Sequence, residues 1–131
     1  MDSMVVSPEE IKPSCSVVIC TRDRPEQLER CLESVSRLDY PRFDVVVVDN
    51  APKDGRTCTV VERWGARYLI EPVVGLSRAR NRGARACNTE IVAYLDDDVL
   101  AEPQWLAGIA REFADPGVMS VAGRILGFEE R

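Results

Sequence analysis

The sequence predicts an α/β protein with a mainly parallel sheet flanked by helices, and three observations favour this class. Two short runs of apolar, β-branched residues, 16–20 and 44–48, have the composition of strands buried on both faces. Between such runs, apolar residues recur at spacings of three and four, which is typical of amphipathic helices. The connections are too long for hairpins, so successive strands are expected to run parallel.

The first three elements are a strand, a helix and a second strand. After the strand at 16–20, Pro25 opens a helix that Pro41 closes. The apolar positions of this helix are Leu28, Cys31, Leu32, Val35 and Leu38. Asp44 to Val48 is the second strand and contains four consecutive valines, which favour a buried parallel strand.

The remaining segments continue the alternation of helix and strand. In order, they are a helix Thr57–Trp64, a strand Arg67–Ile70, a helix Ser77–Cys87, a strand Ile91–Leu95, a helix Pro103–Phe113 and a strand Val118–Ala122. Gly65 is expected to end the second helix, and Ser77 to cap the third. This order indicates one Rossmann-like domain over residues 15–131, after a loose N-terminal leader over residues 1–14.

Composition narrows the class of protein. With 131 residues, 45% hydrophobic and 30% charged, the chain has the composition of a globular domain with one core. Its net charge of −5 argues against a general nucleic-acid binder. We expect no transmembrane segment and a cytoplasmic location, with any membrane association left to parts outside this sequence. The five cysteines include no CxxC pair and are expected to be reduced, and the lack of histidine removes the usual zinc sites.

Polar residues follow three of the predicted strands, where ligands bind in open parallel sheets. These segments are Thr21 to Arg24, Asp49 to Asn50, and Asp96 to Asp98. Three adjacent carboxylates repel one another by roughly 1 to 4 kcal/mol at about 4 Å. A divalent cation, Mn²⁺ or Mg²⁺, that also binds the phosphates of a ligand would relieve this repulsion. Strand alternation would place Asp96 and Asp98 on one side, with Asp97 elsewhere. The alternative is a solvated loop that partly caps the helix near Pro103.

A cluster of arginines lies in the segment 75–85. Arg78, Arg82 and Arg85 share one helical face by their spacing, which usually means a solvated surface. Arg80 and Asn81 lie off that face. Turned toward the strand ends, they would offer a planar cation and an amide to a phosphate or a base.

Together these segments resemble the family 2 glycosyltransferases of the GT-A fold, from about Ser16 to Gly127. Ser16 to Arg24 is similar to the family's first strand and its T-x-N-R turn, with Asp23 where asparagine is common. Val45 to Asn50 is similar to its second strand, and Gly75 to Gly83 to its G-x-x-x-A-R-N-x-G segment. Tyr94 to Asp98, followed by Pro103 and Trp105-Leu106, resembles its DxD region.

The resemblance implies a donor site for a nucleotide-diphosphate sugar. Asp49 would bind the base, Arg80 would lie near the base or diphosphate with Asn81 beside it, and Thr21 and Arg24 would line the pocket. Asp97 or Asp96 would contact the ribose or sugar, since the motif aligns with either. Asp98, with Asp96, would bind the metal. The family's catalytic base and acceptor-binding elements are expected beyond residue 131, so this chain is expected to bind the donor without turning it over alone. The acceptor and the oligomeric state are not indicated.

Other classes fit less well. A receiver domain should have an acidic pair after its first strand and a later lysine, yet no lysine follows Lys53. A nicotinamide-dependent dehydrogenase would need a glycine-rich turn after the first strand, and Cys20 to Pro25 has no glycine. A nucleotidyltransferase, which should carry a basic glycine-rich loop near its start, and a noncatalytic glycosyltransferase-like fragment or scaffold remain as alternatives.

Overall fold

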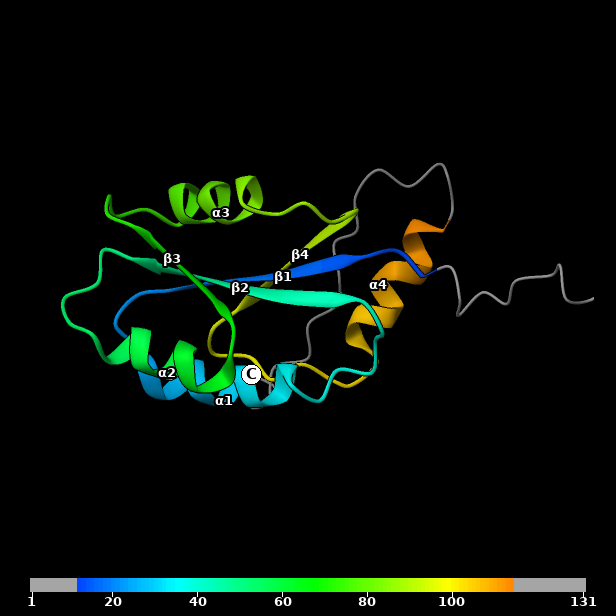
Figure 1. The fold of residues 1–131 in the computed structure, drawn as a ribbon, viewed down its shortest axis with the longest axis horizontal. Helices are drawn as coiled ribbons and strands as arrows, with labels where there is room; N and C mark the ends of the chain where they lie inside the picture. The colour runs from blue at the N-terminus through cyan, green and yellow to red at the C-terminus, as the bar shows by residue number, and fades with distance from the viewer. Residues whose placement is uncertain (1–11, 115–131) are drawn as a thin grey trace, which may run out of the picture.

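The computed structural model describes residues 12–114, which form a four-stranded parallel sheet with helices on both faces (Figure 1). The strands are β1 (Cys15–Thr21), β2 (Phe43–Asn50), β3 (Arg67–Glu71) and β4 (Ile91–Asp96), in the spatial order β3-β2-β1-β4. The helices are α1 (Pro25–Val35), α2 (Arg56–Trp64), α3 (Leu76–Arg85) and α4 (Trp105–Phe113). The predicted fold class is confirmed.

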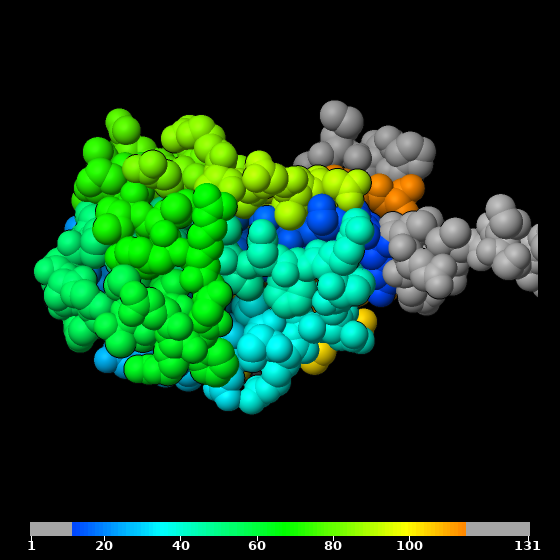
Figure 2. All heavy atoms as spheres, in the orientation of Figure 1, coloured from blue at the N-terminus to red at the C-terminus, as the bar shows by residue number. Residues whose placement is uncertain are grey.

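The two central strands are buried on both faces, as their composition predicts. Val17, Val18 and Ile19 of β1 have no exposed surface, and Val46 to Val48 of β2 are equally enclosed. In the space-filling view, α2, β3 and α3, coloured green, cover much of one end of the sheet (Figure 2). The core therefore fixes β1 and β2, whose ends carry two of the polar segments.

The two faces of the sheet are covered unequally. The larger hydrophobic cluster joins one face to α1, α2 and α4, with Leu28, Val61 and Leu106 among its fully buried side chains. Figure 1 shows α3 on the opposite face from α1 and α2. There the buried cluster is small, and α3 contributes Ala79 to it. Because α3 has small residues on its inner side, its backbone lies close to β1 and β2.

Five helix boundaries differ from the sequence-based prediction, two of them being the start of α2, at Arg56 instead of Thr57, and the end of α3, at Arg85 instead of Cys87. Helix α1 ends at Val35 rather than near Pro41, because the N–H groups of Arg37 and Leu38 bond three residues back and tighten the chain into a turn. Helix α3 begins at Leu76, so the prediction that Ser77 caps it is wrong. Helix α4 begins at Trp105 instead of Pro103. Gly65 does end α2, in the left-handed conformation with φ of 72°.

Other expectations bear on the chain as a whole. All five cysteines are free thiols, two of them buried and three half-buried. Within residues 12–114, no helix combines the length and apolar character needed to cross a membrane. The predicted strand Val118–Ala122 lies outside the described residues.

Candidate functional site

The parallel register brings the ends of β1, β2 and β4 to one edge of the sheet. Thr21 at the end of β1 lies opposite Asp49 of β2, and Cys20 lies opposite Asp96 of β4. The polar segments that follow these strands therefore start side by side, where helix N-termini and loops also converge.

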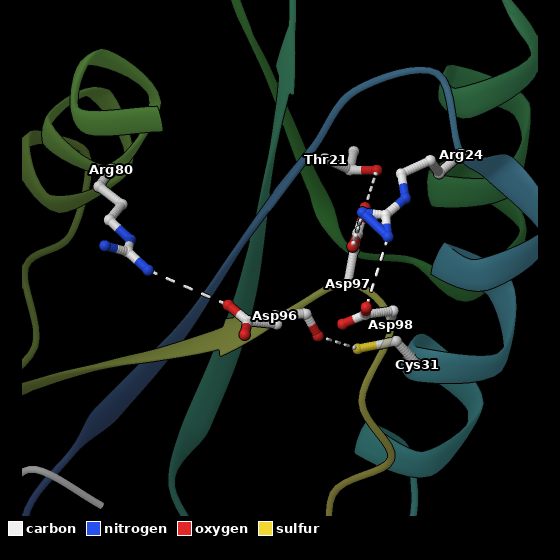
Figure 3. A network of polar contacts seen from close by, with 7 residues as sticks. All are labelled: Thr21, Arg24, Cys31, Arg80, Asp96, Asp97 and Asp98. Carbon is white, nitrogen blue, oxygen red and sulfur yellow. Dashed lines mark hydrogen bonds and ion pairs between the residues drawn. The ribbon is translucent and has the colours of Figure 1, made fainter. Parts of the chain in front are cut away.

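Asp97 forms the centre of a partly buried polar network at this edge (Figure 3). Its side chain is only 6% exposed, and Thr21 Oγ1 donates a 2.7 Å hydrogen bond to its Oδ2. Arg24 Nη1 lies 3.3 Å from Oδ1 of Asp97, and Arg24 Nη2 lies 3.4 Å from Oδ2 of Asp98. Burial raises the pKa of Asp97, although Thr21 and Arg24 both act to lower it. One guanidinium group thus forms ion pairs with two adjacent carboxylates.

Asp96 faces a different cation, Arg80 of α3 (Figure 3). Its Oδ1 lies 4.0 Å from Arg80 Nη2, and the Arg80 guanidinium lies 5.7 Å from the centre of the Tyr94 ring. The expectation that Asp96 and Asp98 share one side is therefore not met. The chain turns directly after Asp96, where the Val99 N–H bonds to the Asp96 carbonyl, so strand alternation does not extend to Asp98.

The part of the alternative that makes the aspartates a helix cap is wrong, although Asp96 and Asp98 are solvated, with side chains 62% and 36% exposed. The residue at the N-cap of α4 is Gln104, and within residues 12–114 no side-chain hydrogen bond caps that helix. The aspartates are held instead by Thr21, Arg24 and Arg80. Their contacts are therefore those of a polar site at the sheet edge rather than those of a helix cap.

A pocket of about 360 Å³ opens beside this network. One side is formed by Thr21, Arg24 and the aspartates 96–98, and the other by Asn50 and the first turn of α3 with its preceding loop. This volume lies within the range of small-ligand sites. Of the residues predicted to bind a ligand, Thr21, Arg24, Asp96, Asp97 and Asp98 line the pocket.

Asn50 shapes the opposite wall of the pocket, and sequence reasoning gave it no role. Its buried amide nitrogen donates to the carbonyls of Glu71 and Val73, both at 2.9 Å, and its Oδ1 accepts a 3.0 Å bond from the Gly75 N–H. This contact explains why α3 needs no Ser77 cap, because Asn50 holds the residue before the helix. An asparagine after a strand is ordinary turn chemistry, so only its position beside Asp49 could have drawn notice.

Asp49 lies apart from the pocket lining. Its side chain is fully buried, with Oδ2 accepting a 2.6 Å hydrogen bond from the Tyr68 hydroxyl. Its Oδ1 is buried with no hydrogen-bond partner among the described residues. Burial raises the pKa of Asp49, and the Tyr68 bond opposes that shift. A buried acceptor without a partner costs stability, which is common at binding sites.

Asp49→Asn is therefore expected to gain stability relative to the wild-type chain as the pH rises. The folded-state pKa of Asp49 is raised, so its favourable contribution is complete at acid pH and is lost as the pH rises through that pKa. Asparagine does not ionise and escapes this loss. Urea unfolding of both chains at several pH values from 4 to 7 should show the difference in their free energies of unfolding growing with pH. A constant difference would argue against a buried, charged Asp49.

The remaining predicted residues lie at or beyond the rim. Arg80 reaches Asp96 but does not line the pocket. Asn81 is exposed, and it makes none of the side-chain contacts around the aspartates that the structure shows for residues 12–114. Arg78 and Arg85 are exposed as expected, and Arg82, also exposed, lies 3.6 Å from Glu71.

The aspartates offer a donor set that fits a divalent cation only in part. Among residues 12–114, no group of three or more acidic or sulfur ligands is arranged to enclose a metal ion. Carboxylate oxygens are nevertheless the ligands that Mg²⁺ and Mn²⁺ prefer, and such ions often take one or two of them and complete their shell with phosphate and water. The residues therefore fit a cation that a phosphorylated ligand shares better than one that the protein binds alone.

The fold and this edge define a Rossmann-like domain with a ligand-sized site among carboxylates and guanidinium groups. A family model described as Glycosyl transferase family 2 matches residues 16–131, and the chain belongs to that family. The resemblance found in the sequence motifs is confirmed. Several of the curated relatives that the chain matches are named as glycosyltransferases.

Two curated relatives and one solved structure illustrate the match. The chain is 32% identical over 121 residues to glycosyltransferase AglE of Haloferax volcanii, covering 86% of this chain and 40% of the relative. It is 37% identical over 122 residues to a pre-mycofactocin glycosyltransferase of Mycobacterium tuberculosis, covering 88% of this chain and 24% of the relative. The mannosyltransferase PcManGT of Pyrobaculum calidifontis, solved with GDP-Man and Mn²⁺, superposes with a TM-score of 0.77 at 31% identity, covering 87% of this chain and 36% of that chain. The chain thus spans less than half the length of each.

Proposed function

We propose that this chain is the donor-binding part of a glycosyltransferase and that it binds a nucleotide-diphosphate sugar with a divalent cation at the pocket beside Asp96–Asp98. The observation that carries the proposal is the sharing of one pocket by these three aspartates and Arg24. A diphosphate and a cation together match this mixture of charges better than either does alone. The complex of PcManGT with GDP-Man and Mn²⁺ supports the same pairing of ligands.

Each residue then has a chemical role. Asp98 would hold the cation, and Asp96 would join it once its side chain turns away from Arg80. Asp97 would contact the ribose or sugar while Thr21 fixes its orientation. A divalent cation at this place supplies Lewis-acid stabilisation of the charge that develops on the departing diphosphate. Arg24 lines the pocket and Arg80 stands at its rim, so both guanidinium groups are available to the diphosphate.

Asp49 would read the base. Its Oδ1, which has no hydrogen-bond partner among residues 12–114, is an acceptor that an N–H group of the base would satisfy once the site opens to admit the base, and Tyr68 holds the other oxygen in place. Asn81 would add an amide at the base or diphosphate end. Transfer of the sugar to an acceptor hydroxyl is proposed for the intact enzyme, because the chain spans only 40% and 24% of the two curated relatives described above.

Calorimetric titration of UDP, GDP and dTDP, each with and without Mn²⁺, tests this proposal. At least one nucleotide should bind, and its affinity should depend on Mn²⁺. Asp98→Asn should weaken the Mn²⁺-dependent affinity by about tenfold or more, since a metal contact is lost. Asp44→Asn is the matched control, because Asp44 is an exposed carboxylate near the start of β2, at the opposite edge of the sheet. Equal affinity of the Asp98→Asn and wild-type chains in Mn²⁺ would refute the assignment of Asp98, and no binding by the wild-type chain would favour a noncatalytic scaffold.

A further inference from the structure

Arg24 provides positive charge beside Asp97 and Asp98, where a divalent cation is also proposed to bind. Its two terminal nitrogens reach separate carboxylates, Asp97 at 3.3 Å and Asp98 at 3.4 Å (Figure 3). The three side chains differ in exposure: 44% for Arg24, 6% for Asp97 and 36% for Asp98. The pair with Asp98 is therefore the solvent-accessible half of the contact, and the pair with Asp97 is the enclosed half.

The backbone around Arg24 is held in place, so its side chain is the part that can move. Asp23 lies in the left-handed region with φ of 56°, and its Oδ1 accepts a 3.2 Å hydrogen bond from the Lys53 N–H. Pro25 follows directly as the first residue of α1. A turn tied to the β2–α2 loop on one side and to a helix start on the other cannot shift far without breaking these contacts.

We propose that Arg24 is a tethered cation that competes with the divalent metal for Asp98. The inference rests on the proposed function. Two cations repel each other at one half-exposed carboxylate, so the guanidinium must leave Asp98 when the metal binds. Asp97 keeps its own contact with Arg24, because Thr21 holds it and it is enclosed. The freed end of the guanidinium then faces the pocket, where a diphosphate would receive it.

This competition makes metal and nucleotide depend on each other. Without nucleotide, the metal must displace Arg24 from Asp98, and the displaced guanidinium nitrogen has no diphosphate to bind. With nucleotide, the diphosphate takes up the displaced charge, so the two ligands should bind together more tightly than the separate affinities predict. Removing the charge at position 24 should therefore strengthen binding of the metal alone and weaken its coupling to the nucleotide.

Titration of Mn²⁺ alone into the Arg24→Gln chain, followed by calorimetry and by electron paramagnetic resonance of free Mn²⁺, tests the inference. Arg24→Gln should bind Mn²⁺ about three- to fivefold more tightly than wild type, the effect expected for removing a partly exposed ion pair. The matched control is Arg37→Gln, which removes an exposed arginine that is paired with Glu33 at 2.8 Å just after the far end of α1. That variant should bind Mn²⁺ with wild-type affinity.

A second measurement needs no variant. Titration of Mg²⁺ into the wild-type chain should shift the Arg24 Nε–Hε signal in nuclear magnetic resonance spectra together with the Asp98 amide. The inference is overturned if Arg24→Gln binds Mn²⁺ no better than wild type, including the case in which neither chain binds it, or if the Asp98 amide responds while the Arg24 signal stays fixed. Mn²⁺-dependent nucleotide binding by the wild-type chain, measured separately, shows whether the proposed function still holds.

Discussion

Gly83→Ala is expected to destabilise the domain by about 2 kcal/mol, although alanine is normally the better helix former. A Cβ at Gly83 would lie 2.5 Å from Val18 Cγ1 and 3.1 Å from Val48 Cγ2. Both valines are fully buried and β-branched, so their methyl groups have little room to rotate away. Overpacking of this kind costs roughly 1 to 3 kcal/mol and outweighs the gain of about 1 kcal/mol in helix propensity.

Thermal unfolding measures this effect, and Gly108→Ala is its matched control. Gly108 also lies inside a helix, but among residues 12–114 a Cβ there would meet only the end of the flexible Arg111 side chain, at 3.8 Å. Gly83→Ala should lower the melting temperature by roughly 10 °C, whereas Gly108→Ala should leave it unchanged or raise it. Equal shifts in the two variants would show that α3 does not pack this closely against β1.

Asn50→Ala is expected to destabilise the chain by about 3 kcal/mol and to weaken nucleotide binding strongly. The substitution removes three hydrogen bonds, and it leaves the carbonyl of Val73 and the N–H of Gly75 without this partner. Each lost bond costs about 1 kcal/mol, and more where a buried group stays unpaired. The loop before α3 forms one wall of the pocket, so its release should also open the site.

Substitution of the exposed Asn88 provides the control for the Asn50→Ala prediction. Asn88→Ala should change neither the urea midpoint nor the affinity for a nucleoside diphosphate with Mn²⁺. Asn50→Ala should lower both the urea midpoint and the affinity for a nucleoside diphosphate. The affinity measured without urea reports whether the loop before α3 still forms the wall of the pocket. An Asn50→Ala chain that binds nucleotide normally would mean that the loop keeps its shape without Asn50.

The parts of the fold that depend on composition were predictable from sequence. The valine run of β2 could be stable only between two covering layers, and the spacing of apolar residues from Leu28 onward marked α1. Helix ends were less predictable, because they depend on partners distant in the chain. Helix α3 starts where Asn50, 25 positions earlier, holds Gly75, and a propensity argument at Ser77 cannot detect that contact.

The site was predictable as a set of segments but not as a set of contacts. Parallel strands bring their ends together whatever follows them, so Thr21 and the aspartates were placed at one edge correctly. Which carboxylate meets which cation depends on the turn after Asp96, and strand alternation wrongly placed Asp96 and Asp98 on one side there. The packing of Gly83 against Val18 was likewise not predictable, because the family motif explained the presence of this glycine without reference to its contacts.

The location of a bound metal is the most direct test of the donor site. Crystals of the chain grown with Mn²⁺ and a nucleoside diphosphate should show an anomalous scattering peak at the carboxylate of Asp98, with the diphosphate between it and Arg24. A nucleotide bound in the pocket with no peak near residues 96–98, or a peak elsewhere on the chain, would contradict the assignment of this sheet edge as a metal-dependent sugar-donor site.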